Sequence, residues 1–141
     1  MSEPWFGEDL HPHWRQSFRV SRELCRARNG GQEIVLFETP GFGRVLALDG
    51  VVQLTSGDEF VYHEMLAHVP VYAHGAVRSA CVVGGGDGGM LREILKHQSV
   101  EQAVLVEIDA QVVAFCRTHM PSVSAGAFDD PRTEIVIADG L

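Results

Sequence analysis

Strand-like and helix-like patterns alternate along the second half of the chain, and this alternation constrains the fold most. Strands joined by helices of about ten residues form a parallel sheet through right-handed crossovers. Such a sheet normally has five or more strands with helices on both faces, so three strands before Leu141 predict a truncated chain that holds half a domain. The expected strands are 79–83, 103–108 and 133–139, and the expected helices are 89–98 and 110–120.

The first half has a different pattern, typical of a small antiparallel sheet. Apolar and polar residues alternate in places over 32–55, and Asp49-Gly50 stands between two apolar runs, where it suits a type I′ turn. A helix is then expected over 58–69, capped by Ser56 or Asp58. Its apolar positions at helical spacing are Tyr62, Leu66 and Val69.

Composition excludes several classes of protein. The 141 residues are 45% apolar in type, enough for a core, but contain neither a membrane-length apolar run nor a signal-peptide pattern. Nineteen acidic residues against eleven basic ones argue against a nucleic-acid partner. Cys25, Cys81 and Cys116 are odd in number and far apart, which predicts reduced thiols in the cytoplasm. We expect Cys81 and Cys116, on apolar elements, to be core residues.

A glycine-rich segment lies between the first expected strand of the parallel sheet and its helix. Gly84, Gly86 and Gly89 fit G-x-G-x-x-G, and Glu107 ends the next strand 23 positions after Gly84. Glycines there let a ligand approach the backbone, and a carboxylate at the next strand end can accept hydrogen bonds from ribose hydroxyls. The pattern favours a nucleoside site over the alternative, a tight turn beside a solvated glutamate.

Asp87, inside this loop, bears on the kind of nucleotide. A carboxylate beside a pyrophosphate would be repelled by roughly 1 to 4 kcal/mol at about 4 Å. A sulfonium nucleoside or an amine would gain from the same charge. The alternative role is a helix cap, and the two roles are compatible.

The sequence "HEMLAH" resembles a zinc-binding helix but has the wrong spacing. His63 and His68 are five residues apart, about 140° around a helix, whereas the metalloprotease pattern requires a spacing of four. We therefore expect no metal at this pair.

Four segments together resemble the spermidine synthases, the polyamine aminopropyltransferases, and the likeness runs from about Trp5 to the last residue. They are "ALDGVVQLTSGDEFVYHEMLAHVP", "VVGGGDGGMLREILKH", "VEIDAQVVAFCR" and "DDPRTEIVIADG". The resemblance implies an α/β protein: a small N-terminal antiparallel β-domain over 1–56, followed by a truncated Rossmann-like (methyltransferase-like) parallel-sheet domain over 57–141. It also implies transfer of an aminopropyl group from decarboxylated S-adenosylmethionine to putrescine, giving spermidine and 5′-methylthioadenosine.

Site residues follow from the resemblance position by position. The polyamine would be bound by Tyr62, His63 and Asp87, with core packing as the alternative role of Tyr62. The general base would be an aspartate beyond Leu141, so the 141 residues alone should be inactive. The nucleoside donor would be bound by Gln32, Gln53, Gly84, Gly86, Glu107, Asp139 and Gly140.

The resemblance further implies no cofactor, because the sulfonium nucleoside is a co-substrate, and a homodimer or homotetramer without nucleic-acid or membrane partners. Two other classes remain open. One is a methyltransferase or nicotinamide enzyme with the same half-fold. The other is a non-catalytic protein that binds a nucleoside or polyamine.

Overall fold

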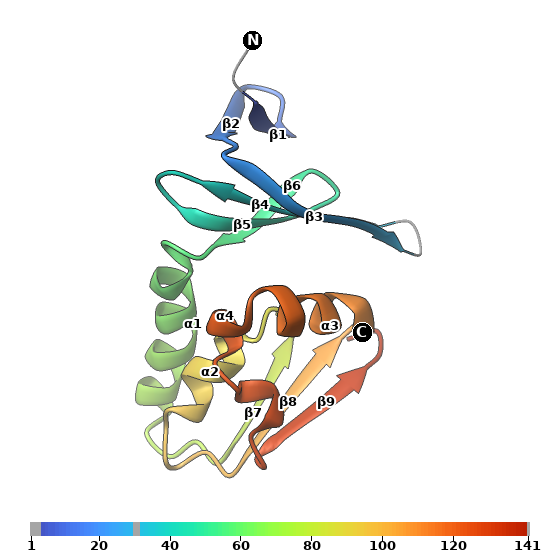
Figure 1. Cartoon of the computed structure of the whole chain (residues 1–141). Helices are drawn as coiled ribbons and strands as arrows, with labels where there is room; N and C mark the ends of the chain where they lie inside the picture. Colours follow the sequence, from blue (N-terminus) through green and yellow to red (C-terminus); the bar gives the residue numbers. More distant parts are fainter. Residues whose placement is uncertain (1–3, 30–31, 141) are drawn as a thin grey trace. The chain divides into compact units, whose positions relative to one another are not determined.

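A computed structural model of the chain describes residues 4–29 and 32–140. The chain divides into two compact units, Met1–Glu59 and Phe60–Leu141. Figure 1 shows strands alone in the first unit, and strands with helices in the second.

The first unit is built from antiparallel strands. A hairpin of β1 (Trp5–His11) and β2 (Trp14–Arg19) precedes a four-stranded sheet in the order β3-β4-β5-β6. The sheet's strands are β3 (Arg22–Asn29), β4 (Gln32–Thr39), β5 (Gly43–Leu48) and β6 (Val51–Thr55). The antiparallel sheet over 32–55 is confirmed, whereas the strands before residue 32 had no individual prediction. A core cluster of the first unit joins Phe18 of the hairpin to Val35, Phe37 and Val45 of the sheet.

The turn between β5 and β6 follows its prediction. Asp49 has φ 50° and Gly50 has φ 79°. A type I′ turn needs positive φ at both central residues, which aspartate tolerates and glycine adopts freely. The two-residue loop therefore has the expected form.

The second unit holds a parallel sheet in the order β7-β8-β9, with helices in the crossovers (Figure 1). Its strands are β7 (Ser79–Val83), β8 (Gln102–Glu107) and β9 (Thr133–Ile137). Its helices are α2 (Gly89–Leu95), α3 (Ala110–His119), the short α4 (Pro121–Ser124) and the 3₁₀ helix η1 (Ala127–Asp129). The predicted fold class is confirmed, although α2 ends three residues early and α4 and η1 had no prediction.

Helix α1 (Glu59–His74) is longer than the helix predicted over 58–69. It continues through Pro70 and ends at His74, and the N–H of the following Gly75 donates to the carbonyl of Val71. The apolar positions at helical spacing, Tyr62, Leu66 and Val69, lie in this helix but are 37%, 57% and 52% exposed, so they do not form its buried face. The buried positions recur every four residues, at Glu59, His63 and Ala67. The small Ala67 lies in the core of this unit, and His63 contacts the glycine loop.

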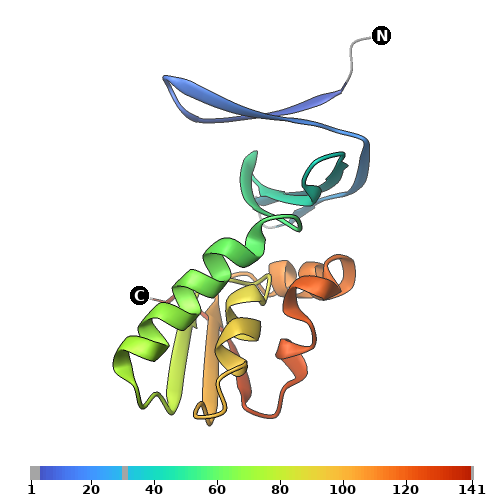
Figure 2. The same ribbon diagram turned by 90° about the vertical axis from the view of Figure 1, so that its left-hand side faces the viewer.

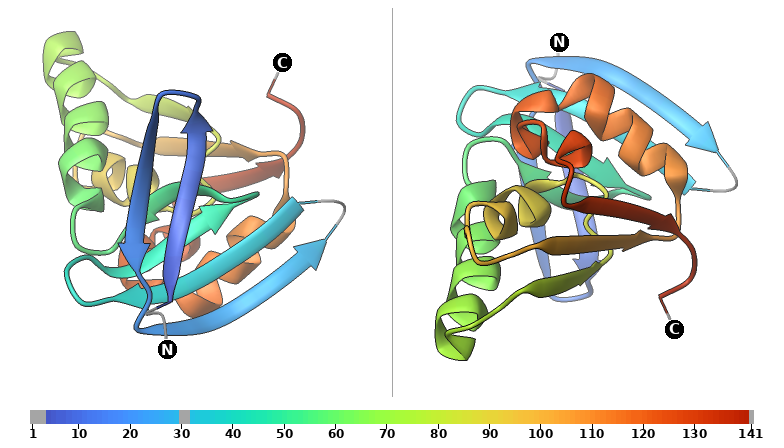
Figure 3. Two further views of the ribbon diagram at one scale, coloured as in Figure 1. Left: turned by 90° about the horizontal axis from the view of Figure 1, so that it is seen from above. Right: turned by 90° about the horizontal axis from the view of Figure 1, so that it is seen from below.

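The two faces of the parallel sheet have different surroundings. Helices α2, α3 and α4 lie on one side (Figures 2 and 3), where Val82, Ala103 and Leu105 are buried. Cys81 and Val104 are paired in register on the opposite face, and Cys81 is exposed. The prediction that Cys81 is a core residue was therefore wrong, because no helix of residues 60–140 covers that face. Cys116, on α3, is buried as expected.

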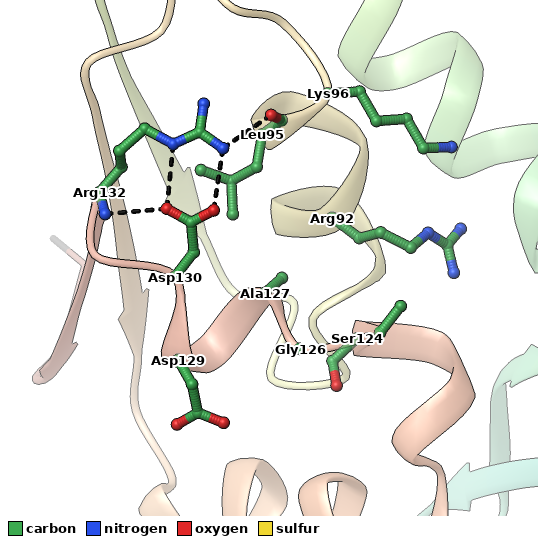
Figure 4. A pocket seen from close by; sticks show the side chains of 10 residues that line it. Arg92, Leu95, Lys96, Ser124, Gly126, Ala127, Asp129, Asp130 and Arg132 are labelled. Atoms are coloured by element: carbon green, nitrogen blue, oxygen red, sulfur yellow. Dashed lines mark hydrogen bonds and ion pairs between the residues drawn. The ribbon is translucent and has the colours of Figure 1, made fainter.

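An arginine braces the segment before β9. Arg132 donates to both carboxylate oxygens of Asp130 at 2.9 Å and to the carbonyl of Leu95, the last residue of α2 (Figure 4). It also donates to the carbonyl of Val100, beyond α2. These bonds hold the pKa of Asp130 at about 2. A pocket of about 330 Å³ adjoins this brace and is lined mainly by charged residues and small residues of the 124–127 segment.

Candidate functional site

The glycine loop turns the chain sharply between β7 and α2. Gly84, Gly85 and Gly88 have φ of 77°, 89° and 81°, a region that other residues rarely adopt. The N–H of Gly84 donates to the carbonyl of Val106 at 2.8 Å, which fixes the loop to β8. The loop thus lies at the carboxyl edge of the sheet, where ligands of such folds bind.

Glu107, at the end of β8, points into this loop. Its Oε2 accepts the N–H of Gly86 at 3.1 Å, and its Oε1 accepts the N–H of Asp109 at the same distance. The residue is 8% exposed. A Cβ at position 86 would come within 3.1 Å of Oε2 and 2.9 Å of Val112. Gly86 therefore lets the carboxylate approach the loop backbone, and two fixed N–H groups orient that carboxylate.

Asp87 has a fixed orientation as well. Its Oδ1 accepts the N–H of Gly89 at 2.7 Å, at the start of α2, and lies 3.2 Å from Nε2 of His63. Asp87 therefore satisfies one free N–H of the first turn of α2, although Gly88 occupies the N-cap position itself. Both of these contacts fall on Oδ1, which is compatible with a second role for Oδ2 in binding a cationic ligand.

His63 is buried beneath the loop rather than open to solvent. It is 1% exposed, and a Cβ at position 89 would overlap its imidazole ring. Gly89, which the G-x-G-x-x-G pattern associates with helix packing, here makes room for a ring from another helix. The adjacent Tyr62 is 37% exposed, with its ring centroid 4.0 Å from that of His63. Tyr62 is thus the accessible member of the pair, and core packing does not describe it.

Asp139 and Gly140 follow β9 at the same edge of the sheet and are exposed. The N–H of Ala138 donates to the carbonyl of Glu107 at 3.0 Å, so this segment runs beside the end of β8. A Cβ at Gly140 would overlap the side chain of Val83, at the end of β7. The second unit therefore brings eight of the ten predicted residues to one region. They are Tyr62, His63, Gly84, Gly86, Asp87, Glu107, Asp139 and Gly140.

The other two predicted residues belong to the first unit. Gln32 begins β4, and Gln53 lies in β6, where its side-chain amide donates to the carbonyl of Val51 at 3.1 Å.

The two loop carboxylates also affect Cys116. Burial, together with the negative charges of Asp87 and Glu107, raises the pKa of this thiol to about 12. The thiol is protonated at neutral pH and is a poor nucleophile.

In the part of the chain that the structure describes, no three histidine, cysteine or acidic side chains come together as a metal site. His63 and His68 have different partners, Asp87 and Glu93.

Comparison with known proteins agrees with this geometry. Residues 59–141 match the family model of the spermine/spermidine synthase domain. The chain belongs to the spermine/spermidine synthase family. Residues 4–56 match a second model, the spermidine synthase tetramerisation domain.

Curated relatives of this family include polyamine aminopropyltransferases of Sodalis glossinidius, 56% identical, and Serratia proteamaculans, 54% identical. Each alignment covers 99% of this chain and 48% of the relative. The chain thus spans about half the length of these relatives. A crystal structure of spermidine synthase with the transition-state analogue AdoDATO superimposes with a TM-score of 0.94 at 44% identity, over 99% of this chain and 49% of the other. The spermidine synthase of Thermotoga maritima gives the same values.

Residues that support the loop had no sequence-based prediction. A Cβ at Gly88 would come within 2.7 Å of both Ser124 and Phe128, so the segment around α4 and η1 packs on the loop. Neither side chain lies in a motif, and the contact depends on tertiary packing.

No helix of the described residues is long and apolar enough to cross a membrane.

Proposed function

We propose that the protein transfers an aminopropyl group from decarboxylated S-adenosylmethionine to putrescine, forming spermidine and 5′-methylthioadenosine. The main support is the pair of fixed carboxylates at the glycine loop, Glu107 and Asp87. Family membership, and relatives named polyamine aminopropyltransferase, support the same reaction.

The charge of the loop favours a sulfonium donor over a dinucleotide. Glu107 can accept ribose hydrogen bonds, while Asp87 would repel a pyrophosphate placed at the start of α2. A sulfonium and an ammonium are both cations, so the same carboxylate stabilises them. No cofactor is required, because the donor itself is consumed.

The chemistry requires a neutral amine. A primary amine has an intrinsic pKa near 10, so one nitrogen of putrescine must lose a proton before it attacks the carbon bound to sulfur. A C–N bond forms, the C–S bond breaks, and methylthioadenosine departs as a neutral thioether. We assign Asp87 and Tyr62 to the amine and place the general base, an aspartate, beyond Leu141. Alignment of nitrogen, carbon and sulfur would supply much of the rate.

Calorimetry on the protein at its natural length tests the donor class. We expect 5′-methylthioadenosine to bind and NAD not to bind. Glu107→Gln should weaken methylthioadenosine by about 1 to 3 kcal/mol, because an amide replaces a charged acceptor. Glu134→Gln, at an exposed glutamate of β9, is the matched control and should leave affinity unchanged. Tighter binding of NAD than of methylthioadenosine would overturn the proposal, and binding without turnover would favour a non-catalytic nucleoside-binding protein.

We further propose that the protein is a cytoplasmic homodimer or homotetramer that assembles through its first unit. The match of residues 4–56 to a tetramerisation domain supports this, as do Trp5 and Trp14 on the first hairpin, 59% and 53% exposed. Free Cys25, Cys81 and Cys116 agree with a reducing compartment. The proposed assembly would be contradicted if the protein sedimented as a monomer at micromolar concentration.

A further inference from the structure

Two histidines of the second unit share a hydrogen bond away from the glycine loop. Nδ1 of His68, on α1, lies 2.8 Å from Nε2 of His97, just beyond α2. Nε2 of His68 lies 3.1 Å from Oε2 of Glu93, on α2. The three side chains therefore link α1 to α2 in a chain of hydrogen bonds.

Glu93 is the anionic end of this chain. Its side chain is 1% exposed, and Oε1 accepts hydrogen bonds from Arg92 at 2.7 Å and Lys96 at 2.8 Å. Burial acts to raise the pKa of Glu93, but the bonds from Lys96 and Arg92 outweigh it and hold the pKa below its usual value. The carboxylate is ionised near neutral pH and accepts the Nε2–H of His68.

The bond between the two rings limits how many protons they can hold. With both rings neutral, Nε2–H of His97 donates to Nδ1 of His68. With His68 protonated, its Nδ1–H donates to Nε2 of His97, and the bond persists. When both rings are protonated, no nitrogen can accept and two cations face each other. The pair therefore accommodates one added proton and is broken by a second.

The surroundings of His97 oppose its protonation. Partial burial and the charge of His68 lower the pKa of His97, and the charge of Glu93 only partly offsets them. The other neighbours are Tyr72, whose ring centroid is 5.1 Å from that of His97, and Arg132, which donates to its backbone carbonyl. Because the folded pKa lies below the usual 6.5, neutral His97 stabilises the fold above pH 6.5. That contribution is lost as the pH falls from 6.5 through the folded pKa.

We propose that His68 and His97 form a clamp that holds α1 against the segment following α2 at neutral pH and opens in mild acid, when both rings are protonated. Helix α1 also carries Tyr62 and His63, so the clamp makes His68 a positioning residue for the glycine-loop site. Only this last consequence, for amine binding, rests on the proposed function. The clamp itself rests on the contacts of His68, His97 and Glu93.

Hydrogen–deuterium exchange of peptides from α1 tests the clamp in the protein at its natural length. Between about pH 7.5 and pH 5.5, after correction for intrinsic exchange, protection of residues 59–74 should fall by about tenfold or more. In His97→Gln the amide can donate or accept but takes up no proton, so the profile should be flat. His74→Gln is the control, since this histidine lies at the exposed end of the same helix and should leave the profile unchanged.

Two results would overturn the clamp: a flat profile in the unsubstituted protein, or the same pH dependence in His97→Gln. Ring ¹⁵N shifts by NMR provide a measurement without substitution, and protonation of both rings with α1 still protected would also refute it. Putrescine affinity, measured over the same pH range, should fall together with α1 protection. If protection falls while putrescine never binds, the clamp is retained and the proposed function fails.

Discussion

At the scale of single residues, the site depends on carboxylates whose oxygens are held by backbone N–H groups. Glu107 accepts from Gly86 and Asp109, and Asp87 accepts from Gly89. Such bonds fix where negative charge lies before any ligand arrives, so less ordering is left for the binding step. The position of the charge then becomes a means of selecting between donors.

Asp87 should distinguish decarboxylated S-adenosylmethionine from S-adenosylmethionine, which carries an additional carboxylate. At about 5 Å and an effective dielectric of about 20, two like charges cost roughly 3 kcal/mol, about a hundredfold in affinity. Asp87→Asn should therefore reduce the ratio by which the protein binds the decarboxylated donor more tightly than S-adenosylmethionine, and it should lower turnover. Dissociation constants of both donors, in both proteins, give the ratio.

Asp129→Asn is the matched control for this change, since the side chain of Asp129 is 71% exposed and faces Arg117. It should leave the preference as it is. An unchanged ratio in a folded Asp87→Asn protein would mean that Asp87 only caps α2, and that the donor carboxylate is excluded by other residues.

At the scale of elements, Arg132 links Asp130 to the end of α2, and this link should make the thermal stability of the fold depend on pH. The pKa of Asp130 is about 2 in the fold against a usual 3.8. Its contribution to stability is therefore complete above pH 3.8 and is lost as the pH falls from 3.8 to about 2. We expect Asp130→Asn to lower the thermal midpoint at pH 6 and to converge with the unsubstituted protein near pH 2.

Thermal unfolding followed by circular dichroism at pH 6, 4 and 2 checks this. The matched change Asp129→Asn should have little effect at any of these pH values, because an exposed ion pair contributes little. A constant difference between Asp130→Asn and the unsubstituted protein down to pH 2 would contradict the role of the brace.

The sequence predicted the elements whose signals are local. The β7-to-β9 alternation, the Asp49-Gly50 turn and the glycine loop follow from periodicity and from backbone conformations that few residues adopt. The buried face of α1 did not follow, because it is chosen by partners distant in sequence: Asp87 for His63, and the core of the second unit for Ala67. The spacing of apolar residues along the helix points to Leu66 and Val69 as its buried positions, but both are exposed.

At the scale of the whole molecule, one face of the parallel sheet has no helix from residues 60–140 over it. Val104 is half-buried on this face, whereas Val82 on the opposite face is 8% exposed. We expect Val104→Thr to increase the solubility of the 141-residue chain with little loss of stability. Val82→Thr, the same change in the core, should cost about 1 to 3 kcal/mol, because its hydroxyl is buried.

The protein concentration at saturation measures the change in solubility, and urea unfolding measures the change in stability. Equal destabilisation by both valine changes would show that the two faces are equally buried in solution. A chain that is already monomeric and highly soluble without substitution would also contradict an uncovered apolar face.

The contact of His63 with Gly89 makes these two positions interdependent over evolutionary time. A methyl group at position 89 overlaps the imidazole, so alanine there is tolerated only after residue 63 becomes smaller. The reverse order is easier, since a smaller residue at 63 leaves a void without a clash. In variant libraries, side chains at 89 should therefore be recovered almost exclusively alongside small residues at 63. The third glycine of a ligand-binding motif is thus retained by a histidine of the protein itself.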